Sequence, residues 1–115
     1  MFIDLKKARV YVRPGFVDMR QAINGLSIVV QTAMSLDPQS GHLFLFCNRG
    51  RCILKALYWE RNGFCLWQKR LEKHKFPWPT SAEAARELSV EQLEWLLSGI
   101  DFFHAHEELK YRSVV

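Results

Sequence analysis

The fold is decided by residues 41–71, GHLFLFCNRGRCILKALYWERNGFCLWQKRL. This stretch contains three apolar runs, at residues 43–47, 52–59 and 64–71, separated by the polar segments 48–51 and 60–63. Short runs rich in aromatic and aliphatic residues, interrupted by Asn and Gly, are typical of strands joined by tight turns. Asn62-Gly63 is the stronger turn signal, because both residues tolerate the positive φ of a type I′ turn. We therefore predict a three-stranded antiparallel meander.

Positive charge is concentrated in the same stretch. Residues 49–75 contain eight basic side chains against only Glu60 and Glu72, which makes the chain's total charge of +4 segregated. Residues 1–48 contain five basic and three acidic side chains, and residues 76–115 contain three basic and seven acidic ones. Cations beside aromatic rings suit a surface that contacts nucleic acid. The predicted nucleic-acid-binding residues are Arg49, Arg51, Lys55, Arg61, Lys69, Arg70, Lys73 and Lys75.

Length and composition indicate an ordinary globular protein. The 115 residues predict one domain over residues 1–115, and the hydrophobic content of 49% suits a folded core. No apolar run reaches the roughly 18 residues that a membrane helix needs, and the N-terminus has no signal-peptide core, so we expect a cytoplasmic protein. The odd number of cysteines, Cys47, Cys52 and Cys65, favours free thiols in a reducing compartment.

Two helical segments and one further strand flank the meander. A β-branched run at residues 10–13 predicts a first strand. Asp18 has the chemistry of a helix N-cap, and an apolar stripe from Met19 to Ala33 predicts a long helix that covers one face of the meander. Gly25 within this helix suggests close packing against the sheet.

The C-terminal part begins with two prolines that bracket Trp78, which we expect to fold back onto the core. A helical region is predicted from Ser81, restarting at Ser89 with a capping box to Gln92 and ending at Gly99. The predicted fold class is α+β: a small antiparallel β-meander packed by a long N-terminal-half helix, with a second helical segment near the C-terminus.

Several sequence blocks occur in an order that is specific when taken together. They are VDMR at 17–20, NGL at 24–26, DPQSGHLF at 37–44, LKALYW at 54–59, GFCLW at 63–67, KRLE at 69–72, FPWP at 76–79 and LEWLLSGID at 93–101. Over residues 9–101 the chain resembles the small TnpB-type accessory protein, encoded between two other transposition genes, of a large bacterial insertion-sequence family. The far longer RNA-guided nucleases that share the TnpB label are a different group.

The resemblance implies a non-catalytic role in transposition beside a separate transposase, with no assigned catalytic residues and no cofactor. The implied partners are the transposase and other products of the same insertion sequence. Double-stranded DNA is a further expected partner, and this expectation rests on the basic residues between 49 and 75.

The sequence gives little support to the hypotheses of catalysis and of metal binding. A two-metal transposase needs three converging carboxylates, whereas Asp18, Asp37 and Asp101 have the positions of a helix cap, a turn residue and a post-helix residue. Only Cys47 and Cys52 form a compact cysteine pair, and His104-Ala105-His106 is a weak ligand pattern. The serines lack a nucleophile elbow, and no phosphate-binding loop of the Walker type occurs.

Two functional hypotheses remain. If Trp59 and Trp67 share one face of the sheet, flanked by Lys55 and Lys69, the sheet offers a nucleic-acid platform; alternatively, both tryptophans belong to the core. The second hypothesis is an adaptor that docks on the transposase through Trp95, Phe102 and Phe103. A homodimer through an edge strand is a further possibility, but the sequence does not say which strand is at the edge.

Overall fold

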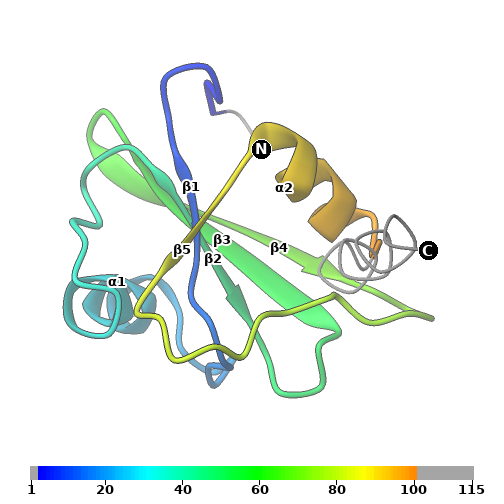
Figure 1. The fold of residues 1–115 in the computed structure, drawn as a ribbon. Helices are drawn as coiled ribbons and strands as arrows, with labels where there is room; N and C mark the ends of the chain where they lie inside the picture. Colours follow the sequence, from blue (N-terminus) through cyan, green and yellow to red (C-terminus); the bar gives the residue numbers. More distant parts are fainter. Residues whose placement is uncertain (1–2, 101–115) are drawn as a thin grey trace.

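The computed structural model describes residues 3–100 as a five-stranded mixed sheet with two helices, an α+β fold (Figure 1). In chain order the elements are β1 (Val10–Val12), α1 (Ile23–Thr32), β2 (Leu43–Cys47), β3 (Ile53–Glu60), β4 (Gly63–Arg70), β5 (Arg86–Leu88) and α2 (Val90–Leu97). The strand order across the sheet is β4-β3-β2-β1-β5, with β1 parallel to β2 and all other neighbours antiparallel. The sheet therefore has β4 at one edge and β5 at the other.

The predicted meander is confirmed as β2, β3 and β4, but its second turn lies one residue earlier than expected. Glu60 pairs with Gly63, so Arg61 and Asn62 are the central turn residues and Gly63 already belongs to β4. Arg61 has the positive φ, 52°, within this turn.

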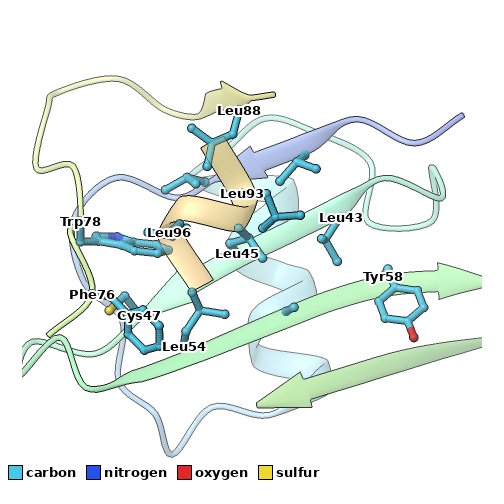
Figure 2. Packing of buried hydrophobic residues seen from close by; sticks show 13 residues of the cluster. Leu43, Leu45, Cys47, Leu54, Tyr58, Phe76, Trp78, Leu88, Leu93 and Leu96 are labelled. Atoms are coloured by element: carbon cyan, nitrogen blue, oxygen red, sulfur yellow. The ribbon is translucent and has the colours of Figure 1, made fainter. Parts of the chain in front are cut away.

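Each face of the sheet is covered by one helix (Figure 1). On the α1 side, Leu26 and Val30 pack against Phe44, Phe46 and Leu57. On the α2 side, Leu93 and Leu96 pack in a cluster with strand residues and with the segment after β4 (Figure 2). The fully buried members of this second cluster include Val12, Leu43, Leu45, Cys47, Leu54, Ala56 and Phe76. Side chains alternate between the two faces along each strand, so β2 and most of β3 are apolar and buried on both sides, whereas the residues of β4 are only partly buried or exposed.

The helix α1 is shorter than predicted, with ten residues. Its N-cap is Ala22, so the assignment of Asp18 as the N-cap was wrong. The carboxylate of Asp18 instead accepts hydrogen bonds from the backbone N–H and the guanidinium of Arg20. A side chain at Gly25 would meet Gln21, 3.1 Å away, and not the sheet, which corrects the predicted reason for this glycine.

The segment after β4 folds back onto the core as predicted. Trp78 is 7% exposed, and its indole N–H donates to the carbonyls of Arg13 and Gly15. The helical region expected from Ser81 is absent from residues 81–88. That stretch ends in the short strand β5, because Leu88 gains burial and a backbone partner by pairing with Val10 of β1.

The predicted ends of α2 are confirmed. Ser89 and Gln92 form a reciprocal capping box at its start. At its end Gly99 has a φ of 77°, and the N–H groups of Gly99 and Ile100 donate to the carbonyls of Leu96 and Trp95. This pattern of two closing hydrogen bonds around a left-handed glycine is the usual way to end a helix.

Candidate nucleic-acid interface

Five of the eight predicted basic residues lie at one end of the sheet. Arg49 and Arg51 are in the β2–β3 turn, Arg70 ends β4, and Lys73 and Lys75 are in the loop that follows. We call this group the basic end. The β2–β3 turn and the loop after β4 both lie at the end of the meander opposite the β3–β4 turn (Figure 1).

Backbone hydrogen bonds hold the two halves of the basic end together. The N–H of Leu71 donates to the carbonyl of Cys52 at 2.8 Å, and the N–H of Phe76 donates to the carbonyl of Arg51 at 2.7 Å. Phe76 is fully buried, and Leu71 packs against the same apolar cluster. The loop that carries Lys73 and Lys75 is therefore anchored at both ends against the turn that carries Arg49 and Arg51.

Asn48 shapes the arginine-bearing turn. Its side-chain Oδ1 accepts from the N–H groups of both Cys52 and Ile53 at 3.0 Å, and its carbonyl accepts from the N–H of Arg51. Arg51 has a φ of 59°. Sequence reasoning did not identify Asn48 as a site residue, although an asparagine that directly follows a strand is a known signal for turns closed by its side chain.

The cations of the basic end have few partners among residues 3–100. Arg70 forms an ion pair with Glu72 at 3.1 Å, in which both side chains are mostly exposed, so the pair is weak. Within residues 3–100, no side-chain hydrogen bond or ion pair involves Arg49, Arg51, Lys73 or Lys75. No described residue therefore competes with an external anion for these four charges.

The two predicted lysines within the strands have internal partners. Lys55 is 8% exposed, and its ammonium donates to the carbonyls of Met19 and Gln21 at 2.9 Å each. Lys69 donates to the carbonyl of Leu97 at 2.7 Å, where the end of α2 attracts a positive charge. The ammonium of Lys55 thus ties the segment before α1 to the sheet, and that of Lys69 ties the C-terminal end of α2 to it.

The predicted tryptophan platform is wrong. Trp67 lies opposite Ala56 and packs with the α2-side cluster. Trp59 lies opposite Phe64, and the two rings meet edge-on with their centroids 5.0 Å apart. Residues directly opposite each other share a face, and neighbours along a strand alternate. Trp59 and Trp67 therefore point to opposite faces of the sheet.

Arg61 lies apart from the basic end. It sits in the β3–β4 turn, just after Glu60, whereas the basic end adjoins Ile53 at the other end of β3. The eight residues of β3 place Arg61 about 26 Å from the basic end at the usual rise per strand residue.

The predicted partner-binding residues are only partly described. Trp95 on α2 is 37% exposed, and the apolar residues Val90 and Ile100 near it in the chain are also exposed. Phe102 and Phe103 lie outside the described residues, as do Asp101, His104 and His106.

Reactive groups are sparse in the described part of the chain. Among residues 3–100, no group of three His, Cys, Asp or Glu side chains could hold a metal ion. Burial raises the pKa of the Cys47 thiol to about 12, which keeps it protonated and unreactive. Asp37 accepts from the N–H of Gln39, as expected of a turn residue. Neither helix between residues 3 and 100 is both long and apolar enough to cross a membrane.

Comparison with known proteins identifies related chains. The family model described as "IS66 Orf2 like protein" matches residues 8–107. The chain is 38% identical over 102 residues to the uncharacterized protein y4hO of Sinorhizobium fredii, covering 89% of each chain. It is 37% identical over 98 residues to the uncharacterized protein y4jC of the same organism, covering 82% of this chain and 80% of that one. No solved structure matches significantly.

Proposed function

Because the chain belongs to the IS66 Orf2-like family, which implies an accessory role in transposition, we propose that it supports transposition by contacting insertion-sequence DNA through its basic end. The proposed role is non-catalytic and is carried by a single domain over residues 1–115. Reaction chemistry is left to the separate transposase.

The observation that carries this proposal is the group of four basic-end cations that have no side-chain hydrogen bond or ion pair within residues 3–100. These cations lie on two backbone segments that are tied together by hydrogen bonds, so all four charges can attract the same stretch of phosphates. They are Arg49, Arg51, Lys73 and Lys75. Closely spaced lysines and arginines bind DNA phosphates and release counterions.

Contacts to phosphates, and not to base edges, fit the placement of these residues. All five lie in turns or at a strand end, and neither α1 nor α2 contains an arginine or a lysine that could enter the major groove from a helix. The binding is therefore expected to be mainly electrostatic and only weakly dependent on sequence.

A salt titration with duplex DNA tests the proposal. If all five cations contact phosphates, the slope of log affinity against log salt is about −4.5, and affinity falls roughly 500-fold between 50 and 200 mM salt. Absence of any binding to duplex DNA at 50 mM salt would remove the proposal.

A matched pair of variants separates the basic end from net charge. Lys73→Ser with Lys75→Ser removes two charges at the basic end, and Lys6→Ser with Lys7→Ser removes two exposed charges near the N-terminus. Both variants have the same net charge. The first is expected to weaken DNA binding at least tenfold more than the second, and equal losses would show that only overall charge matters.

A second candidate function is docking on the transposase. It is favoured by the exposure of Trp95, 37%, on a helix whose other outward residues include Glu91 and Glu94. Large partly exposed aromatic residues are frequent anchors of protein interfaces. Under this hypothesis the transposase co-purifies with the wild-type protein and not with Trp95→Ala, while Ile28→Ala, an exposed apolar residue on α1, leaves co-purification intact. Retention of the transposase by Trp95→Ala would exclude this anchor.

A further inference from the structure

Within residues 3–100, the edge strand β4 is protected only at its end, where Lys69 and Arg70 are its charged residues. It is eight residues long, its first six residues are uncharged, and it contains no proline. Its pairing with β3 runs without interruption from Gly63 to Arg70, so no bulge twists it away. Natural edge strands usually carry such devices, because an open edge presents unpaired N–H and C=O groups to other strands. The opposite edge, β5, has only three residues, two of which are charged.

The backbone groups of β4 that face outward can be identified. The N–H of Leu71 donates to Cys52, and hydrogen-bonded pairs alternate along an antiparallel ladder. The odd-numbered residues of β4 therefore bond to β3. The N–H and C=O groups of the even-numbered residues, Phe64, Leu66, Gln68 and Arg70, point away from the sheet.

We propose that a second copy of this chain pairs with β4 in an antiparallel arrangement, on a two-fold axis at Trp67, to give a continuous ten-stranded sheet. With this axis all four outward-facing residues find partners in β4 of the other copy. Phe64 lies opposite the partner's Arg70, and Leu66 lies opposite the partner's Gln68. The pairing supplies about eight backbone hydrogen bonds.

The side chains of β4 are compatible with self-pairing. Trp67 meets the partner's Trp67 at a non-hydrogen-bonded position, where side chains come closest and aromatic pairs are favourable. Arg70 meets an aromatic ring, and Lys69 meets the partner's Cys65, so no like charges stand opposite each other. A parallel arrangement would instead bring the two basic ends together, which their charge opposes.

The arrangement has a consequence for DNA contact that rests on the proposed function, whereas the dimer itself does not. The two Arg70 residues stand about 20 Å apart along the strand direction, at opposite ends of the paired strands. One dimer would thus present two separate basic ends, each able to contact a different stretch of DNA.

Amide hydrogen exchange on the wild-type protein tests the pairing without DNA. The N–H groups of Phe64, Leu66, Gln68 and Arg70 are expected to exchange quickly at low protein concentration and at least tenfold more slowly at high concentration. The odd-numbered residues between them are expected to be protected throughout. Fast exchange of the even-numbered set at every concentration would overturn the proposal. Protection that is already complete at the lowest concentration, in a monomer by sedimentation, would also overturn it, because the edge would then be covered within one chain.

Gln68→Pro provides an independent test by sedimentation velocity. Gln68 is exposed and its N–H points outward, so proline blocks the edge without removing a bond to β3. The dimer dissociation constant is expected to rise at least tenfold in Gln68→Pro and to change less than threefold in the matched control Gln68→Thr, which keeps the N–H. An unchanged dimer in Gln68→Pro, or a dimer that both substitutions weaken equally, would contradict pairing through this backbone edge. If Gln68→Pro fails to fold, the exchange experiment on the wild type decides.

Discussion

Replacement of Asn48 by alanine is expected to destabilise the protein through the β2–β3 turn. The Oδ1 of Asn48 accepts two hydrogen bonds of 3.0 Å, from the N–H groups of Cys52 and Ile53, and both donors are only partly accessible to water. Alanine leaves these donors without their protein partner. A typical hydrogen bond contributes about 1 kcal/mol net, and a donor left unsatisfied costs about 1–3 kcal/mol.

Because the turn lies at the surface, water can replace part of what is lost. We therefore expect the free energy of unfolding to fall by about 2 kcal/mol, the lower part of the range for two donors. For a chain of this size that loss corresponds to a decrease in Tm of roughly 8 °C. Urea unfolding followed by tryptophan fluorescence measures the first quantity, and calorimetry measures the second.

Asn48→Asp is the matched control, because it keeps an oxygen acceptor at the same position. It is expected to lie within about 1 kcal/mol of the wild type at neutral pH, since its carboxylate can accept the same two hydrogen bonds. If Asn48→Ala were as stable as Asn48→Asp, the side-chain amide could not be what holds the turn of the basic end.

Three other predictions concern buried or paired groups. Lys55→Met leaves the carbonyls before α1 without their donor and is expected to cost about 1–3 kcal/mol in urea unfolding; an unchanged midpoint would show that the ammonium does not hold α1. The Cys47 thiol, with its pKa raised to about 12 by burial, should resist iodoacetamide at pH 8 in the folded protein, and mass spectrometry would detect its modification if it does not. The hydrogen bonds from Arg20 lower the pKa of Asp18 to about 2, so the stability that this carboxylate contributes is complete above its ordinary pKa of 3.8 and is lost as the pH falls through about 2. Asp18→Asn is therefore expected to flatten the acid part of the stability profile, and an identical profile would contradict the pairing.

Local sequence patterns predicted the meander and α2 because their signals are contained within each segment. The apolar runs of β2, β3 and β4 are long enough to define strands, and the Ser89 capping box and Gly99 define both ends of α2. The strand β5 has only three residues, and its existence depends on pairing with β1, a contact that is remote in sequence.

The start of α1 was misplaced for a related reason. The apolar stripe includes Met19, but the carbonyls of Met19 and Gln21 accept from the ammonium of Lys55, far along the chain. That long-range contact holds the segment before Ile23 in a non-helical path. Hydrophobic periodicity does not reveal a distant side chain, such as Lys55, that donates to carbonyls which a longer helix would use in its own hydrogen bonds.

The orientation of the tryptophans depended on one turn. The alternation of side chains shows which residues of one strand share a face of the sheet. Only the position of the turn shows which residues of the next strand share that face. With Arg61 and Asn62 as the central pair, Glu60 pairs with Gly63, so residues with numbers of the same parity in β3 and β4 face opposite sides. Trp59 and Trp67 lie on opposite faces of the sheet for this reason, so they cannot form one stacking surface.

The salt dependence of DNA binding tests the role of the basic end most directly. Fluorescence anisotropy of a labelled duplex, recorded from 50 to 200 mM salt, gives the slope of log affinity against log salt for each protein. Replacement of Lys73 and Lys75 by serine is expected to make the slope less negative by about 1.8, because two phosphate contacts are lost, whereas replacement of Lys6 and Lys7 should leave it unchanged. Identical slopes in the two double variants would contradict contact between the basic end and DNA.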